Sequence, residues 1–220
     1  MKQLAEDVYM LRGFPPNFIN VYLIGGVLID AATRQGERRI MRQIGGRKVT
    51  AHALTHAHAD HQGSSHAICE QLGIPLWCGR EDIPAMEAGV KLPTTAPWPI
   101  RAFEERFWAG PPHLVARSLA EGEEVAGFTV LETPGHSPGH VAFWRESDRV
   151  LILGDVLNNM NVRTGIPGLH QPPDFFTPDP ERNRESARQL AALEPALVCF
   201  GHGAPLRDTG KLREFVAGLT

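Results

Sequence analysis

Four side chains that bind metal ions well lie within six residues of one another. They are His56, His58, Asp60 and His61, in the segment THAHADH at residues 55–61. In an extended chain, side chains two positions apart share a side, so His56 and His58 can point to one ion while a following turn redirects Asp60 and His61. Structural zinc sites usually contain cysteine, whereas this cluster contains none. The spacing therefore predicts a metal centre that performs catalysis.

Three later segments each place one more metal-binding side chain at the end of a predicted strand. These side chains are His136, Asp155 and His202, and each follows a glycine, which lets the chain turn sharply at a sheet edge. Taken alone, each is explained equally well as a hydrogen-bonded core histidine or a turn aspartate. Because sites in layered folds gather where strand ends converge, the three residues and the cluster together predict a single site.

The elements that must position these residues follow the order of strands and then helices, twice along the chain. The first half predicts strands at residues 8–11, 19–23, 27–29, 49–54 and 76–78 and helices at 35–43 and 66–72; the second half predicts strands at 124–131, 141–144, 150–153 and 196–200 and helices at 180–193 and 209–216. This order favours an α+β fold in which two sheets pack face to face between helices, a four-layer αββα sandwich. No linker or low-complexity tract interrupts it, so we expect a single domain over residues 1–220.

Residues 80–117 differ from the rest in their content of proline and aromatic residues. We expect them to form an insertion over one face of the domain. Its apolar side chains could form a cap beside the metals that suits an acyl chain or an aromatic group: Trp98, Ile100, Phe103, Phe107 and Trp108. Packing of the insertion against the domain, or a contact in a homodimer, explains them equally well.

Composition limits the partners and the location. The formal charge of −3 shows no basic excess, so we expect no nucleic-acid partner. The three cysteines are odd in number and far apart, which favours a reduced, cytoplasmic protein. Two acids lie where a signal peptide needs apolar residues, and no apolar run is long enough to span a membrane. The expected partner is a small-molecule substrate.

The ordered set of motifs resembles the metallo-β-lactamase superfamily over nearly the whole chain. The resemblance rests on the HxHxDH motif at residues 56–61, on the three later ligands, and on the strand at 27–29 with its terminal Asp30. It implies that His56, His58 and His136 hold a first metal ion, that Asp60, His61 and His202 hold a second, and that Asp155 bridges the two. Asp30 would support the site without binding a metal.

Such a site performs hydrolysis. Two cations about 3.5–4 Å apart can share a water and lower its pKa toward about 7, so that a metal-bridged hydroxide attacks a carbonyl carbon. We expect a binuclear zinc hydrolase with two Zn²⁺ per chain, with iron or manganese as alternatives, that acts on a small ester, thioester or lactone. Asp60 is the candidate catalytic residue, which orients the water or carries its proton.

Several other residues are candidates for contact with the substrate or for support of the site. Substrate contacts are predicted for His170, Trp98, Phe103 and Asn158, with His113, Asn159 and Asn161 as further candidates. His52 and His66 are expected to support the ligands from outside or to lie at the surface. His140 is expected to be structural or to support the ligands, and Cys199 to pack in the core.

Several branches of the superfamily fit this chain poorly. A secreted β-lactamase is disfavoured by the missing signal peptide and by the acid at 155, and a tRNA nuclease by the net charge. Glyoxalase II adds a C-terminal region that grips glutathione, whereas little chain follows His202. Acyl-homoserine lactonases use a tyrosine near the carbonyl, but Tyr9 and Tyr22 both lie near the N-terminus. An iron persulfide dioxygenase-like oxidoreductase and a non-catalytic ligand-sensing module remain as alternatives from other functional classes.

Overall fold

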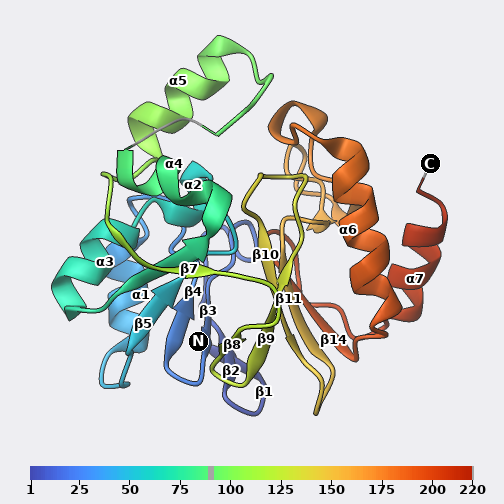
Figure 1. The fold of residues 1–220 in the computed structure, drawn as a ribbon, viewed down its shortest axis with the longest axis horizontal. Helices are drawn as coiled ribbons and strands as arrows, with labels where there is room; N and C mark the ends of the chain where they lie inside the picture. The colour runs from blue at the N-terminus through green and yellow to red at the C-terminus, as the bar shows by residue number, and fades with distance from the viewer. Residues whose placement is uncertain (89–91, 220) are drawn as a thin grey trace.

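Two β-sheets pack face to face and helices cover their outer surfaces (Figure 1). The structure is a computed structural model that describes residues 1–88 and 92–219. The arrangement is the α+β, four-layer αββα sandwich that the order of predicted elements favours.

The first sheet has seven strands, and the chain adds them in order. They are β1 (Lys2–Ala5), β2 (Val8–Met10), β3 (Tyr22–Ile24), β4 (Val27–Ile29), β5 (Ala51–Ala53), β6 (Leu76–Gly79) and β7 (Val115–Leu119). Pairing is antiparallel from β1 to β4 and parallel from β4 to β7. Helices α1 (Glu37–Ile44) and α3 (Ser65–Leu72) pack on the outer face, and the one-turn α2 (Ala59–Gln62) lies close after β5.

The second sheet has five strands in the order β14–β11–β10–β9–β8. Their bounds are β8 (Glu124–Val125), β9 (Phe128–Glu132), β10 (Val141–Arg145), β11 (Val150–Gly154) and β14 (Leu197–Phe200). Helices α6 (Pro180–Ala192) and α7 (Gly210–Ala217) cover its outer face. Asp179 begins α6, because its side chain accepts a hydrogen bond of 3.0 Å from the backbone N–H of Arg182.

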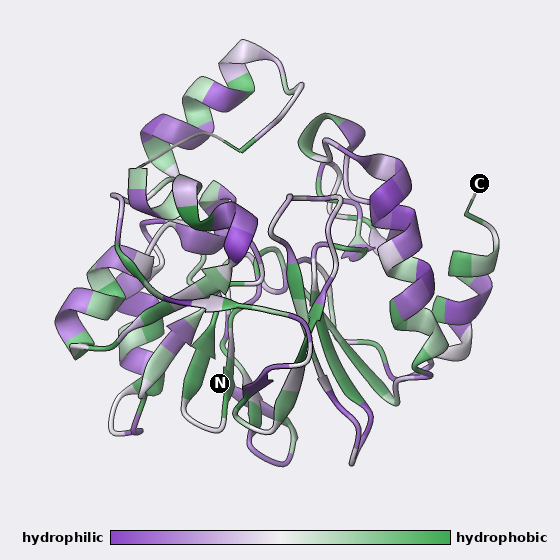
Figure 2. Ribbon diagram, in the orientation of Figure 1, coloured by the Kyte–Doolittle hydropathy of each residue, from purple (hydrophilic) through white to green (hydrophobic). Residues whose placement is uncertain are grey.

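Both faces of β4 and β11 are buried, so these strands are apolar at nearly every position rather than at every second one. In β11, Val150 and Ile152 point into the core between the sheets, whereas Leu151 and Leu153 pack against the helices. Figure 2 shows the same pattern, with green strands inside and helices that are partly purple. Burial of each such side chain stabilises the fold by about 1.5–3 kcal/mol.

Residues 80–114 leave the first sheet after β6, and we call them the cap segment. It contains the 3₁₀ turn η1 (Arg80–Asp82), α4 (Ile83–Ala88) and α5 (Trp98–Phe107). The predicted insertion ran to residue 117, but residues 115–117 belong to β7 and pair with β6. Helix α5 buries none of its side chains fully and lies at the edge of the molecule (Figure 1).

A short ribbon after β11 completes the structure. It consists of β12 (Asn158–Met160) and β13 (Pro167–His170), and the 3₁₀ turn η2 (Asp174–Phe176) follows. Among the described residues, no helix has both the length and the apolar character needed to cross a membrane.

Candidate metal centre

Four strand ends bring all seven candidate ligands to one edge of the sandwich. The loop after β5 carries the cluster at residues 56–61. In the second sheet, β9 and β11 are both antiparallel to β10, and β14 is parallel to β11, so β9, β11 and β14 run in the same direction. Their C-terminal ends therefore meet, and they are followed by His136, Asp155 and His202.

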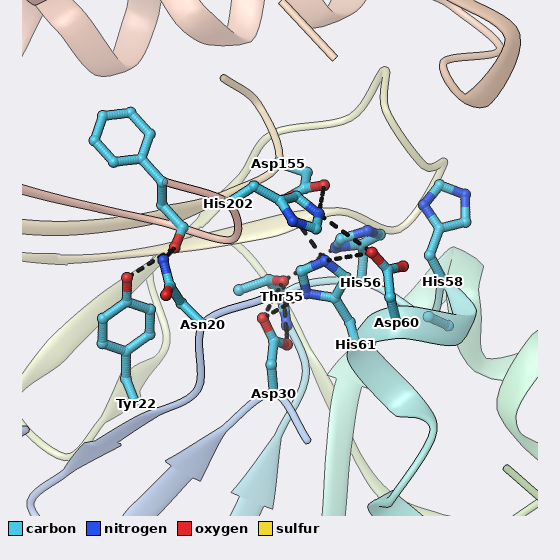
Figure 3. Close-up of polar contacts among 12 residues, drawn as sticks. Asn20, Tyr22, Asp30, Thr55, His56, His58, Asp60, His61, Asp155 and His202 are labelled. Carbon is cyan, nitrogen blue, oxygen red and sulfur yellow. Dashed lines mark hydrogen bonds and ion pairs between the residues drawn. The ribbon is translucent and has the colours of Figure 1, made fainter. Parts of the chain in front are cut away.

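The seven side chains form three overlapping groups in which the ligand atoms lie within 4.8 Å of one another: His56, His58 and His136; His56, His61 and Asp155; Asp60, His61 and His202. In the first group, Nδ1 of His58 lies 3.0 Å from Nε2 of His136. Around the third, Nε2 of His202 lies 3.2 Å from Oδ2 of Asp60 and 3.1 Å from Oδ2 of Asp155. Figure 3 shows His202, Asp60 and His61 pointing toward one another.

The residues fit metal ions, because several of their buried polar atoms have no hydrogen-bond partner among the described residues. They are Nε2 of His56, His58 and His61 and Oδ1 of Asp155. Leaving a buried polar atom unpaired costs about 1–3 kcal/mol, so several such atoms at one place call for a ligand. Imidazole nitrogen and carboxylate oxygen are the donors that Zn²⁺ and Fe²⁺ accept.

The direction of the histidine pKa shifts differs between two parts of the site. Burial, followed by the neighbouring histidines, lowers the pKa of His56, and burial with His58 does the same for His136. These imidazoles are therefore neutral, which is the form that binds metal. Burial also acts to lower the pKa of His202, but Asp155 and Asp60 outweigh it and raise that pKa to about 10. The carboxylates thus concentrate negative charge around His61 and His202.

Partners outside the centre orient the ligands. Nδ1 of His61 donates to Oδ2 of Asp30 at 2.9 Å, which leaves Nε2 facing the site. Asp30 also accepts from the backbone N–H of Thr55 at 2.8 Å, so it fixes the start of the cluster loop. Asp30 therefore has the supporting position that the resemblance implies. Nδ1 of His136 lies 3.2 Å from the hydroxyl of Thr177.

Two histidines outside the candidate ligand set connect separate parts of the fold. Nε2 of His140 accepts from the backbone N–H of Asp155 at 3.1 Å, and its Nδ1 lies 2.8 Å from the hydroxyl of Thr133. Nδ1 of His52 donates to the carbonyl of Leu28 at 3.0 Å, and its Nε2 lies 2.8 Å from the hydroxyl of Ser65. His140 therefore supports a candidate ligand, as expected, whereas His52 is fully buried and joins parts of the fold, so it neither supports a candidate ligand directly nor lies at the surface.

Asp82 of η1 is a supporting residue that the sequence did not reveal. It is fully buried and accepts three hydrogen bonds of 2.8 Å, from the backbone N–H of Ala57, the hydroxyl of Ser137 and the backbone N–H of Gly139. It therefore joins the loop of His56 and His58 to the loop of His136. Its sequence context, one of two adjacent acids in a helical stretch, gives no signal of this contact.

Two glycines allow the close approach of strand ends. Gly154 has a φ of +57°, and a Cβ there would lie 2.7 Å from Nε2 of His140. A Cβ on Gly201 would collide with the carboxylate of Asp155. Larger residues at either position would displace the ligands that follow or face them.

The loop of His202 rests on the N-terminal part of the chain. Nδ1 of His202 donates to the carbonyl of Phe18, and the side chain of Asn20 donates to the carbonyl of Gly203 at 2.7 Å. The hydroxyl of Tyr22 donates to the carbonyl of Phe200 at 2.7 Å (Figure 3). Tyr22 is thus buried away from the candidate ligands. Its hydroxyl bonds to the backbone, so it is not positioned to contact a substrate.

A cavity of about 240 Å³ opens over the ligands. Its floor is formed in part by the candidate ligands His58, Asp60, His136, Asp155 and His202. Its walls come from three separate parts of the chain: Phe18; Ile100, Phe103, Glu104 and Trp108 of the cap segment; and Asn158, Val162, Arg163, Pro173, Phe175 and Phe176. Apart from Asn158, sequence reasoning did not anticipate the third part, and it did not anticipate Phe18 or Glu104. Burial, and then the charge of Asp60, raises the pKa of Glu104 to about 8.

The predicted substrate residues divide into two groups. Phe103 and Asn158 line the cavity, whereas Trp98 and His170 are not among its lining residues. Trp98 is 72% exposed. At 3.6 residues per turn it lies about 200° around α5 from Ile100, so the face that meets the cavity excludes it. His170 lies on β13, opposite Asn158.

The remaining candidates also lie apart from the cavity lining. The side chains of Asn159 and Asn161 bond to the backbone of neighbouring loops, and His113 contacts His66 instead of the cavity.

Comparisons with known proteins agree with this geometry. The family model of the metallo-beta-lactamase superfamily matches residues 14–202. The chain is 30% identical to the Bacillus subtilis (strain 168) protein "Probable metallo-hydrolase YflN", over 91% of this chain and 86% of that protein. It is 29% identical to the hydroxyacylglutathione hydrolase GloC of Haemophilus influenzae, over 52% of this chain and 53% of that enzyme. The crystal structure of TTHA1623 in a di-iron-bound form superposes with a TM-score of 0.67 at 31% identity and covers 87% of this chain and 90% of that one.

Proposed function

From the premise that the chain belongs to the metallo-β-lactamase superfamily, we propose that it is a binuclear metallohydrolase that cleaves a small ester, thioester or lactone. The observation that carries the proposal is the position of Asp155. Its Oδ2 lies 3.6 Å from Nε2 of His136 and 3.1 Å from Nε2 of His202, and its Oδ1 lies 3.6 Å from Nε2 of His61. One carboxylate thus reaches both groups of histidines.

The ligands divide between two Zn²⁺ ions in this proposal. His56, His58 and His136 would hold the first, Asp60, His61 and His202 would hold the second, and Asp155 would be shared between the two groups. Divalent cations held there supply an activated water at neutral pH and an electrophile for a carbonyl oxygen. Since TTHA1623 crystallised in a di-iron-bound form, iron is the alternative metal.

Asp60 is the proposed catalytic residue among the ligands. Burial would raise the pKa of its carboxyl, but His61 and His202 outweigh burial and lower it, so the group is ionised at neutral pH. Asp60 also lines the cavity. An ionised carboxylate at the cavity floor accepts a hydrogen bond from a water and orients it toward the substrate.

The cavity walls favour a substrate with an apolar acyl or ring portion. Ile100, Phe103 and Trp108 of the cap segment face Phe175 and Phe176 of the loop around η2 across the same space. Such walls bind apolar groups and exclude bulk water from the bond that breaks. The partial likeness to a hydroxyacylglutathione hydrolase, whose substrate is a thioester, supports a thioester among the three classes.

Metal quantification together with a substrate panel tests the proposal. We expect two zinc ions per chain and metal-dependent hydrolysis of at least one member of a panel of esters, thioesters and lactones. One iron per chain with oxygen uptake would instead indicate a dioxygenase. Ligand binding without turnover across the panel would indicate a sensing module.

A further inference from the structure

A second cluster of metal-binding side chains lies apart from the metal centre. His66 and Glu70 belong to α3, and His113 lies near the end of the cap segment; their ligand atoms lie within 4.8 Å of one another. Nδ1 of His66 lies 3.2 Å from Nδ1 of His113, and Nδ1 of His113 lies 3.8 Å from Oε1 of Glu70. None of the three side chains lines the cavity over the metal centre.

The separation of the two imidazole nitrogens suits a shared cation. In a neutral imidazole one ring nitrogen carries a lone pair, so two nitrogens at this distance need a proton or a metal ion between them. Tetrahedral zinc with Zn–N bonds of about 2.0–2.1 Å holds two nitrogens about 3.3–3.4 Å apart. The observed 3.2 Å between His66 and His113 is close to that value.

The backbone holds the three side chains in place. His66 and Glu70 are four residues apart on α3 and therefore share one face of the helix. The backbone N–H of His113 donates to the carbonyl of Met86 in α4 at 2.8 Å, and Val115 begins β7 two residues later. The cluster is therefore formed without rearrangement of the chain.

The charge state of the cluster also favours a metal. The side chain of His113 is 14% exposed, and burial, followed by His66, lowers its pKa, so the imidazole is neutral. Glu70, with a side chain that is 66% exposed, adds a carboxylate that can swing toward an ion. Two imidazoles and a carboxylate are a common donor set for zinc.

We propose that His66, Glu70 and His113 form a second, separate site for a divalent transition-metal ion such as Zn²⁺, with water completing the coordination. The ion would tie α3 to the chain as it returns from the cap segment into β7 (Figure 1). A few residues before His113, the same stretch packs closely against the turn between α2 and α3. A Cβ on Gly110 would collide there with the carbonyl of Gly63. The site would therefore anchor one end of the cavity wall.

Zinc counting on the protein with its metal centre loaded tests the proposal. Wild type and the His66→Gln and His113→Gln variants are equilibrated with buffered free zinc and analysed by atomic emission. We expect the wild type to bind one zinc per chain more than either variant, and Glu70→Gln to bind the same extra ion only at a higher free zinc concentration. Glu185→Gln on α6, an exposed acid, serves as the matched control and should keep the wild-type count.

A second readout keeps the test independent of activity. Added zinc should raise the Tm of the loaded wild type and leave that of His113→Gln unchanged, since an ion that binds only the folded state stabilises it. Equal zinc counts in folded wild type and His113→Gln, with equal Tm responses, would overturn the proposal and leave the His66–His113 contact as a shared proton. Because zinc counts and Tm shifts are compared between the wild type and the variants, the outcome does not depend on which metals the main centre contains.

Discussion

Asp155 shows how the position of one side chain depends on several others. Its backbone N–H is held by His140, and Gly201 leaves the space that its carboxylate occupies. His202 and His61 outweigh the effect of burial and lower the pKa of this carboxyl, so it remains ionised. A negative charge between two groups of histidines offsets the charge of the cations that they are proposed to hold.

Replacing the charge while keeping the shape tests this role. We expect Asp155→Asn to lower kcat by at least about 100-fold and to lower the metal content, because even the partners of metal ligands contribute 10–100-fold. Steady-state kinetics and metal analysis measure both, and circular dichroism checks the fold. Asp208→Asn, at an exposed acid, is the control. Full metal content with wild-type kcat in Asp155→Asn would contradict the proposed mechanism.

The grouping of the seven candidate ligands could be predicted from the sequence because their chemistry resides in residue type and local spacing. His56, His58 and His61 lie in one short motif, and the later ligands follow strands and glycines. The support given by Asp82 could not be predicted, since it depends on contacts with Ala57 and Gly139, which the fold alone brings close. Periodicity likewise carries no information on such contacts.

At the scale of elements, η1 and α5 position the two sides of the site. The turn η1 supplies Asp82, which holds two ligand loops together, and α5 supplies one apolar wall of the cavity. Both belong to the cap segment, so this segment does more than cover a face. Most buried strands were predicted because apolar runs identify them, whereas β1, β7, β12 and β13 were missed because each is partly exposed or contains polar residues.

Removal of the Asp82 carboxylate should loosen both loops. We expect Asp82→Ala to lower the free energy of unfolding by about 3 kcal/mol, because buried N–H groups of Ala57 and Gly139 lose their acceptor. Urea unfolding followed by circular dichroism measures the change. Asp208→Ala should change it by less than about 0.5 kcal/mol, as expected for an exposed ion pair. Equal stabilities of the two variants would show that Asp82 is not a structural link.

The wall formed by α5 leads to a prediction about substrate binding. Phe103→Ala should raise KM for substrates with an apolar acyl group and leave the metal content unchanged, since Phe103 lines the cavity without touching the ligand set. Trp98→Ala should raise KM less, because Trp98 lies on the exposed side of the helix. Measurements of KM for substrates of increasing acyl length separate the effects of the two substitutions. A larger effect at Trp98 would place the substrate on the other face of α5.

At the scale of the whole molecule, the apolar clusters enclose all three cysteines. Cys199 lies between the sheets, and Cys69 and Cys78 lie beneath α4. Burial raises the pKa of Cys199 and of Cys69 to about 12, and raises that of Cys78 as well. Below that pH the thiols are protonated, and the reactive thiolate is scarce.

The thiols should therefore report on unfolding. At pH 8 we expect an aromatic disulfide reagent to label none of them in the native protein and all three in urea, as measured by absorbance. Labelling in the native state should follow the rate of opening of the fold. Rapid labelling of one cysteine in native protein, with the others protected, would show that its part of the core is open.

The contact between the His202 loop and the N-terminal residues has a consequence for biosynthesis. The N–H of Gly203 donates to the carbonyl of Asn17, and the N–H of Asn20 donates to that of Gly201, so the loop of the last candidate ligand closes against residues that are translated long before it. While β14 is still inside the ribosome, the nascent chain displays the cluster at residues 56–61 without the side chain that completes it. The full set of candidate ligands therefore assembles only after residue 202 has been translated and has left the ribosome.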